Sequence, residues 1–300
     1  MVSLMSDKSD IPYQSPLVPN LLAESDLIQF RCHKGIACFN ECCRNIDITL
    51  TPYDLLRLKQ RLELSSKELL NQYTLPFEMD AHGTPGVKLK PVEGGTACQF
   101  MTEDGCSVYE DRPTACRYYP LGLMSIRKSG EYSDEQGFAL VKEDHCLGHN
   151  EDRTLTIQEY REEQGVEEYD ELTREWRRLI LKKKSAGPSI GKPPEMSLQL
   201  FFMASYNVDQ FQQFVTSEQF LGTYQLEPDL IESLKTDQLE VIKFGARLLK
   251  QVLFGEITIE VVSGATEKRV QRQKARAEEL RELARKQAEA DTKAAEGKGS

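Results

Sequence analysis

The chain has 300 residues, 39% of them hydrophobic, which suffices for the core of one large or two small domains. Its net charge of −10 and pI near 5.1 disfavour nucleic acid as a partner, because phosphate binding needs a basic face. No apolar run reaches the ~18 residues of a membrane helix. The first 17 residues also lack the basic and apolar regions of a secretory signal. The sequence therefore predicts a cytoplasmic protein with reduced thiols and no membrane span.

Local patterns along the chain predict an α+β fold, in which an irregular cysteine-rich domain of short strands and helices precedes a helical C-terminal subdomain. Ile46–Leu50 is strand-like. Thr51 then suits a helix N-cap, Pro52 the first helical position and Asp54 the positive end of the helix dipole. Two further helix starts are predicted where a hydroxyl residue precedes a glutamate by three positions, at Ser65 with Glu68 and at Thr156 with Glu159.

Changes in composition divide the chain into segments. Proline is frequent at the N-terminus, a proline- and glycine-rich stretch follows residue 184, and the C-terminus is charged with few apolar residues. The predicted segments are a polar extended arm (1–27), a cysteine-cluster metal-binding domain (28–150), charged helices (151–184), a linker (185–196), a helical subdomain (197–262) and a charged polar tail (263–300).

The cysteines are confined to one part of the chain. They are Cys32, Cys38, Cys42, Cys43, Cys98, Cys106, Cys116 and Cys146. Clustered cysteines in a reducing compartment are more often metal ligands or redox groups than disulfides, so we predict that all eight are metal ligands. The alternative is that some of them are small buried hydrophobic residues.

Thiolates are natural ligands of both zinc and iron–sulfur clusters. Eight of them could fill two four-coordinate sites, or one site with cysteines left over. Neighbouring side chains on an extended chain point to opposite sides. The adjacent Cys42 and Cys43 could therefore serve two centres, or one of them could be a packed or redox-active thiol.

The order of the motifs resembles a known family. The motifs are Phe30-Arg31-Cys32, Cys38-Phe39-Asn40-Glu41-Cys42-Cys43, Leu50-Thr51-Pro52-Tyr53-Asp54, Cys98-Gln99-Phe100, Cys106-Ser107-Val108-Tyr109-Glu110-Asp111-Arg112-Pro113 and Cys116-Arg117-Tyr118-Tyr119-Pro120. Residues 30–150 resemble the CxxCxxCC cysteine-cluster family of zinc- or iron-chelating domains, in which flagellin lysine-N-methylase is a relative. The first gaps here are five and three residues instead of two and two, which is similar to the methylase branch.

The resemblance implies zinc or iron without choosing between them. Structural zinc sites usually contain paired CxxC motifs, and this chain has none. We therefore predict an iron–sulfur cluster, with zinc as the alternative. Arg112 and Arg117 flank Cys116 and could hydrogen-bond to cluster sulfides, or could form surface ion pairs instead. His33 and His145 each neighbour a cysteine and could be exposed or could support the site.

The predicted function is metal binding, with an electron-transfer or oxidoreductase role toward an unidentified protein or redox partner. One alternative is a zinc-stabilised binding or adaptor module without catalysis. Another is a protein-modifying enzyme of the lysine-methylase type. The chain has no GxGxxG after a strand, no phosphate-binding loop and no GxSxG motif. A glycine-rich strand–turn signature for S-adenosylmethionine is also absent from the sequence, so the resemblance does not carry the methylase activity across.

Overall fold

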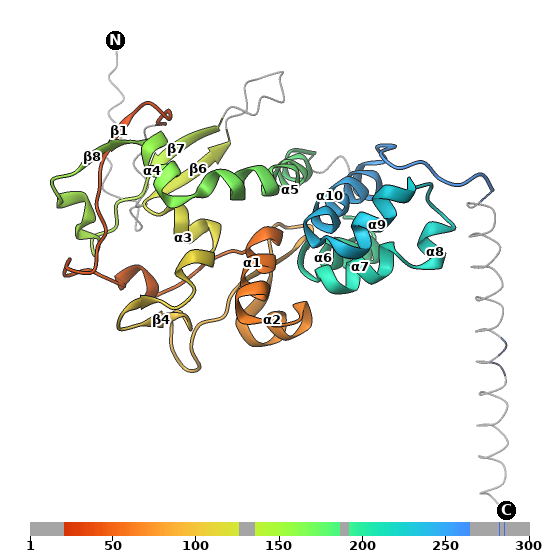
Figure 1. Ribbon diagram of the computed structural model, residues 1–300, viewed down its shortest axis with the longest axis horizontal. Coiled ribbons are helices and arrows are strands. Elements are labelled where there is room, and N and C mark those ends of the chain that lie inside the picture. Colours follow the sequence, from red (N-terminus) through yellow and green to blue (C-terminus); the bar gives the residue numbers. More distant parts are fainter. Residues whose placement is uncertain (1–20, 126–135, 187–191, 265–281, 283–284, 286–300) are drawn as a thin grey trace, which may run out of the picture.

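The computed structural model describes residues 21–125, 136–186 and 192–264, together with Glu282 and Arg285. Within these residues the predicted α+β class is confirmed. Short strands form four two-stranded antiparallel sheets, and the helices lie mostly toward the C-terminus (Figure 1). Most of the predicted arm and tail, and the centre of the predicted linker, lie outside the described residues.

The sheets pair β1 with β8, β2 with β3, β4 with β5, and β6 with β7. The strands are β1 (Leu27–Gln29), β2 (Thr74–Glu78), β3 (Pro85–Leu89), β4 (Met101–Thr102), β5 (Gly105–Cys106), β6 (Leu121–Ser125), β7 (Gln136–Leu140) and β8 (Thr154–Thr156). The α-helices are α1 (Pro52–Leu62), α2 (Ser66–Tyr73), α3 (Thr114–Tyr118), α4 (Ile157–Gln164), α5 (Val166–Ala186), α6 (Glu195–Tyr206), α7 (Val208–Val215), α8 (Glu218–Leu221), α9 (Pro228–Thr236) and α10 (Gln238–Phe254). Short 3-10 helices are η2 (Glu41–Cys43), η3 (Tyr109–Asp111) and η4 (Leu147–Asn150).

The helix starts predicted from the sequence are confirmed at α1, α2 and α4. The Thr51 hydroxyl accepts a hydrogen bond from the backbone N–H of Asp54 (3.1 Å), and the Asp54 carboxylate accepts one from the N–H of Thr51 (2.8 Å). The same reciprocal pair begins α2 at Ser65 and α4 at Thr156. Each pair satisfies backbone N–H groups that a helix start would otherwise leave without partners.

The strand-like run Ile46–Leu50 lies against β3 but forms only an isolated bridge with it. The N–H of Leu50 donates to the carbonyl of Val87, and the N–H of Leu89 donates to the carbonyl of Ile48, both at 2.9 Å. This pairing ties the segment between η2 and α1 to β3.

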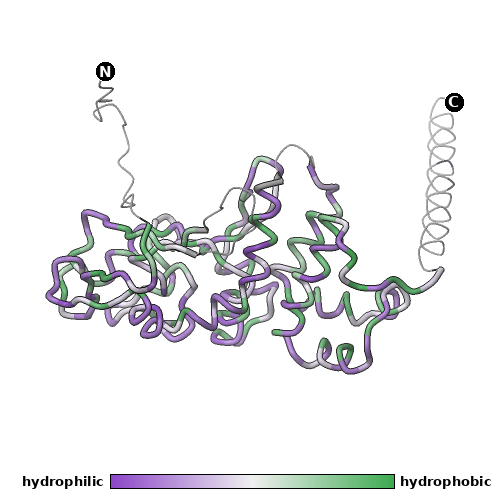
Figure 2. Tube along the Cα trace, turned by 90° about the horizontal axis from the view of Figure 1, so that it is seen from above, coloured by the Kyte–Doolittle hydropathy of each residue, from purple (hydrophilic) through white to green (hydrophobic). Residues whose placement is uncertain are grey.

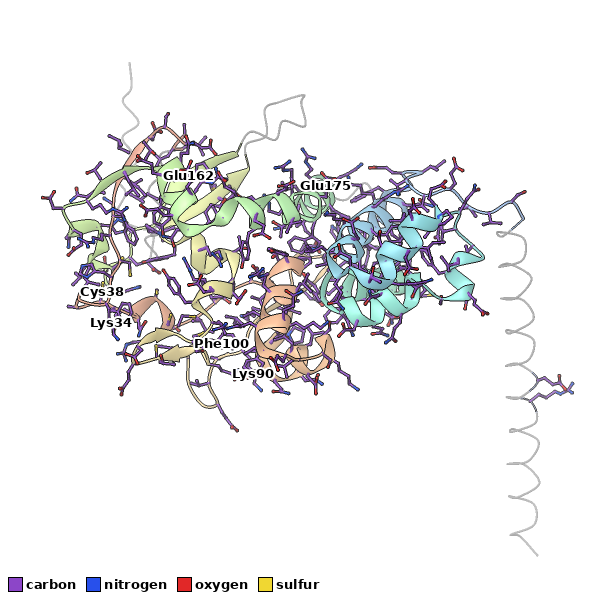
Figure 3. All side chains as sticks on the ribbon, viewed as in Figure 1. Lys34, Cys38, Lys90, Phe100, Glu162 and Glu175 are labelled. Atoms are coloured by element: carbon purple, nitrogen blue, oxygen red, sulfur yellow. The ribbon has the colours of Figure 1, made fainter. Side chains whose placement is uncertain are left out.

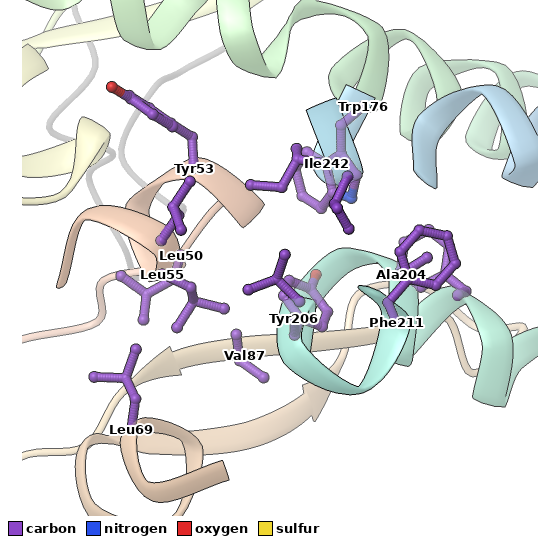
Figure 4. Packing of buried hydrophobic residues seen from close by; sticks show 14 of the residues in the cluster. Leu50, Tyr53, Leu55, Leu69, Val87, Trp176, Ala204, Tyr206, Phe211 and Ile242 are labelled. Carbon is purple, nitrogen blue, oxygen red and sulfur yellow. The ribbon is translucent and has the colours of Figure 1, made fainter. Parts of the chain in front are cut away.

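The larger of two hydrophobic clusters, called here the helical cluster, joins α1, α2, β3, α5 and the helices from α6 to α10. In Figure 4, Leu55 of α1, Val87 of β3 and Phe211 of α7 all face this shared core. Residues from before and after the predicted linker therefore pack in one core.

The second cluster, called here the sheet cluster, joins β1, α3, β6, β7, β8 and α4. Phe138 and Ile157 are fully buried in it. Helix α5 runs between the two ends of the molecule (Figure 1). Its first residue, Val166, belongs to the sheet cluster, whereas Trp176 belongs to the helical cluster. The long helix thus connects the two cores.

Hydropathy changes repeatedly along the chain trace in Figure 2, so apolar residues occur in short stretches. In the part of the chain that the structure describes, no helix is both long and apolar enough to cross a bilayer. The prediction of no membrane-spanning helix is confirmed for those residues.

The segment between β2 and β3 is fastened to α5 by a largely buried ion pair between Asp80 and Lys183 (3.0 Å). Burial opposes ionisation of Asp80, but hydrogen bonds from Thr84, Lys183 and the His82 N–H outweigh it and hold the pKa of Asp80 below its usual value. We expect Asp80→Asn to lower the free energy of unfolding by about 2 kcal/mol at pH 7, measured by urea denaturation.

The effect of Asp80→Asn depends on pH with a defined sign. A depressed pKa in the folded state stabilises the protein above the unfolded pKa of about 3.9, and this contribution is lost as the pH falls toward the folded value. The difference between wild type and variant should therefore shrink below about pH 4. Asp47→Asn is the matched control, because Asp47 pairs with Lys88 at the surface and should contribute less than about 0.5 kcal/mol. Equal effects of the two substitutions would contradict the prediction.

Candidate metal centre

All eight cysteines line one cavity of about 690 Å³, and all are free thiols. They come from the loop after β1, from η2, from the segment between β3 and α3, from α3 itself and from the start of η4. Figure 3 labels Cys38 at the outer end of this region and Phe100 nearer to α1, and both line the cavity. Among the described residues, no three Cys, His, Asp or Glu side chains meet at one point that could hold a single metal ion. The thiols thus surround the cavity.

The four N-terminal cysteines lie on a segment that turns repeatedly. Asn40 has a φ of 67°, in the left-handed region that asparagine tolerates better than most residues. Its side-chain amide donates to the carbonyl of Thr102 (2.9 Å), which ties the turn to β4. The turn leads directly into η2, which carries Cys42 and Cys43.

On an extended chain, the side chains of Cys42 and Cys43 would point to opposite sides. In η2 they lie closer together than that. A 3-10 helix has three residues per turn, so neighbouring side chains are rotated by about 120° and do not point to opposite sides. The Sγ atoms of Cys42 and Cys43 are 3.9 Å apart. Hydrogen bonding with Cys43 lowers the pKa of the Cys42 thiol to about 7, and the same interaction raises the pKa of Cys43.

Cys98 and Cys106 are held next to η2 by backbone hydrogen bonds. The N–H of Cys98 donates to the carbonyl of Cys43 (2.8 Å). The N–H of Met101 donates to the carbonyl of Cys98 (3.1 Å), and Met101 pairs with Cys106 across the β4–β5 hairpin. The β4–β5 hairpin therefore places Cys106 beside Cys98.

Cys146 is connected to the N-terminal segment from the far end of the region. It is the N-cap residue of η4, and the N–H of the next residue, Leu147, donates to the Sγ of Cys38 (3.2 Å). This hydrogen bond joins the first and the last part of the cysteine-bearing region.

The remaining thiols resist ionisation because they are crowded and partly buried. Cys32 is exposed as a residue, but partial removal of its thiol from water raises its pKa to about 11, with a further contribution from neighbouring thiols. Burial is also the main cause of the raised pKa of Cys98, Cys106 and Cys116. Together these thiolates would repel one another, and bound cations would offset that repulsion. The donor set therefore fits a soft, positively charged metal group.

The two arginines singled out in the sequence occupy different positions. Arg112 lines the cavity and donates to the side chain of Gln164 (2.5 Å), and its charge partly offsets the burial that raises the pKa of Cys106. Arg117 donates to the backbone carbonyls of Gln164 (2.7 Å) and Arg112 (3.1 Å), so it fastens α3 to the end of α4. A role of either arginine beside a bound cluster stays a prediction.

His33 and His145 both line the cavity. The Nε2 of His33 lies 3.0 Å from a carboxylate oxygen of Glu151, and the Nε2 of His145 lies 3.6 Å from one of Glu143. The Nε2 atom of each histidine thus has an acidic neighbour that orients the ring.

Sequence reasoning missed the second role of Asp54. The side chain is fully buried and, besides capping α1, accepts hydrogen bonds from the N–H (2.8 Å) and hydroxyl (2.7 Å) of Thr114 at the start of α3. Cys116 follows two residues later in the same helix. Because the contact joins residues 60 positions apart, the local capping pattern could not reveal it.

Tyr118 and Tyr119 follow Cys116 at the end of α3 and face different surroundings. Tyr118 is buried in the sheet cluster. The hydroxyl of Tyr119, however, is buried at the cavity wall near Cys146 and Glu143, and among the described residues it has no hydrogen-bond partner of normal geometry. Burial raises its pKa, and Cys146 and Glu143 raise it further. When two tyrosines are adjacent in a sequence, nothing in the pattern shows which of them faces a site.

Residues 31–147 match the CxxCxxCC family, which is described as “Putative zinc- or iron-chelating domain”. The match covers about two-fifths of the chain and includes all eight cysteines. It agrees with the family resemblance of the motifs and supports metal binding by this region, with zinc or iron as the metal. No curated protein and no solved structure matches the chain.

Proposed function

We propose that the cysteine-lined cavity holds an iron–sulfur cluster and that the protein transfers electrons to or from a partner. The observation that carries this proposal is the convergence of eight thiols, from segments more than a hundred residues apart, on a single cavity. Zinc or iron chelation by this region is supported by the family match. The choice of iron and the redox role are the steps that the proposal adds.

The size of the cavity favours a cluster over bare ions. A cavity of about 690 Å³ has room for much more than one or two ions, since even a water molecule takes only about 30 Å³ in the liquid. A tetrahedral zinc site with bonds of about 2.3 Å brings its four sulfurs to within about 3.8 Å of one another. The four ligands of a [4Fe–4S] cluster stand further apart, because each binds a different iron atom. Among the described residues, no three Cys, His, Asp or Glu side chains are grouped so that they could hold a single ion.

The surroundings of the thiols suit a redox centre near the surface. Cys32 and Cys42 are exposed, so part of the site is accessible to a partner. The Leu147 N–H that donates to Cys38 (3.2 Å), and the positive charge of Arg112 in the cavity wall, both favour added negative charge at the sulfurs. Such contacts raise the reduction potential of a bound iron–sulfur cluster, which when present supplies one-electron transfer.

Anaerobic purification tests this proposal. We expect a brown protein with a broad absorption in the visible range that bleaches on reduction with dithionite, and with equal amounts of iron and acid-labile sulfide. Absorption spectroscopy together with metal and sulfide analysis gives the result. A colourless protein with stoichiometric zinc would contradict the redox role and would favour a zinc-stabilised binding module.

A further inference from the structure

We propose that residues 33–40, called here the cover loop, act as a lid over the cysteine-lined cavity, and that opening of this lid sets how fast the metal group enters and leaves. The loop carries Cys38 and leads into η2. Lys34 and Cys38 of the loop lie at the end of the molecule away from the C-terminal helices (Figure 3). The proposal rests on the metal-binding part of the proposed function and applies to iron and zinc alike.

The cover loop lies between the cavity and the solvent. Lys34 and Ala37 are exposed. Ile36, by contrast, is only 8% exposed and lines the cavity together with Phe39. Two successive turns give the loop these two sides, because the N–H of Ile36 donates to the carbonyl of His33 (3.1 Å) and the N–H of Phe39 donates to the carbonyl of Ile36 (3.0 Å).

The inner side of the cover loop does not join either core. Among the described residues, neither Ile36 nor Phe39 belongs to the helical cluster or to the sheet cluster. Segments with few apolar contacts to a core open at a lower free energy than the core itself. The loop can therefore open while both cores stay folded.

One edge of the cover loop is fastened to the β4–β5 hairpin. The side-chain amide of Asn40 donates to the carbonyl of Thr102 (2.9 Å), and the ammonium group of Lys34 pairs with the carboxylate of Asp104. The side chains of this ion pair are 63% and 88% exposed, so the pair contributes little and weakens in salt. The amide hydrogen bond is therefore the stronger of the two fastenings.

An aromatic contact completes this edge. The ring of Phe39 lies against Gly105 of β5, where a Cβ atom would stand only 3.3 Å from the Cζ of Phe39. Gly105 has a φ of 119°, which glycine adopts readily. The missing side chain at this position lets the loop approach the hairpin closely.

The other edge of the cover loop is held to η4 and supplies the hinge. The N–H of Arg31, just before the loop, donates to the carbonyl of Gly148 (3.0 Å). The N–H of Leu147 donates to the Sγ of Cys38 (3.2 Å). This edge includes a hydrogen bond between backbone groups, whereas each fastening described at the hairpin edge depends on a side chain. We therefore expect the hairpin edge to release first.

The rate of metal transfer to a chelator tests the lid. Asn40→Gly removes the amide donor, and glycine readily adopts the left-handed backbone of this position (φ 67°). Lys34→Met removes the charge. With pyridylazoresorcinol under anaerobic conditions, we expect the loaded protein to release its metal about fivefold faster in Asn40→Gly and about twofold faster in Lys34→Met. Metal content at saturation should equal that of the wild type. Lys235→Met, which breaks an exposed ion pair with Glu232 on α9 (3.4 Å), is the matched control and should keep the wild-type rate.

Salt gives a second signature of the hairpin edge. Because salt screens an exposed ion pair, release from the wild type should be faster at about 1 M than at about 0.05 M sodium chloride. Lys34→Met should lose most of this dependence. Equal release rates in all variants, or a salt dependence that persists unchanged in Lys34→Met, would overturn the lid.

Hydrogen–deuterium exchange of the metal-loaded protein distinguishes a lid from a general support of the fold. In Asn40→Gly, amides of residues 33–40 should exchange faster than in the wild type, while amides of residues 98–118 should keep the wild-type rate. Equal acceleration in both segments would show that the loop and the cavity wall open together, and the lid would be overturned.

These outcomes separate the lid from the identity of the metal. Zinc in the wild type would contradict the iron proposal, yet faster release of zinc from Asn40→Gly would still support the lid. An iron–sulfur cluster that is lost at the same rate from every variant would support the redox function and overturn the lid. A wild-type protein with no bound metal would overturn both.

Discussion

Removal of the metal is expected to loosen the loops that carry the cysteines while the helices of the C-terminal end stay folded. Metal-binding free energy becomes folding free energy where the ligand segments have little other structure. Between residues 31 and 50 the chain forms one short 3-10 helix and an isolated bridge, and β4 and β5 are two residues each. By contrast, α10 contributes Val241, Leu248 and Leu249 to the buried core.

Hydrogen–deuterium exchange before and after treatment with a chelator measures this difference. We expect amides in residues 31–50 and 98–118 to exchange at least about 100-fold faster without metal, equivalent to about 3 kcal/mol of local stability. Amides of α10 serve as the internal control and should change little, and adding the metal back should restore the slow exchange. Equal acceleration in α10 would show that the metal supports the whole fold, and no acceleration at all would contradict a structural role of the metal.

Local signals in the sequence predicted local structure well. Thr51, Ser65 and Thr156 begin helices as expected, because a capping box involves residues only three positions apart. The sequence also located the cysteine-bearing region, whose eight thiols line one cavity in the structure. For Cys42 and Cys43, it could not show the 3-10 turn that sets their 3.9 Å separation.

Features that depend on packing between distant segments could not be predicted from sequence patterns. The contact of Cys98 with Cys43 joins residues 55 positions apart through backbone atoms, which leave no mark on the side-chain pattern. Helix α5 carries Val166 into one cluster and Trp176 into the other, although both lie in one charged helical stretch. Composition therefore indicates where segments change, but only packing determines which segments share a core.

Replacement of Asp54 is expected to damage both the fold and the part of the cysteine-lined cavity around Cys116. Its buried carboxylate accepts hydrogen bonds from the N–H of Thr51 (2.8 Å) and from the N–H and hydroxyl of Thr114 (2.8 and 2.7 Å). Alanine would leave these donors without partners in the interior. We expect Asp54→Ala to lower the free energy of unfolding by about 3–5 kcal/mol, measured by urea denaturation of the metal-loaded protein.

The asparagine variant separates the loss of hydrogen bonds from the loss of charge. Asp54→Asn keeps a carbonyl oxygen that can accept from Thr114, so its destabilisation should be about 1–2 kcal/mol. Because Thr114 begins the helix that carries Cys116, we also expect Asp54→Ala to bind less metal than the wild type, and Cys116 to be the thiol that gains most reactivity toward iodoacetamide. If the alanine variant keeps full stability and a protected Cys116, then the link from α1 to α3 does not position this ligand.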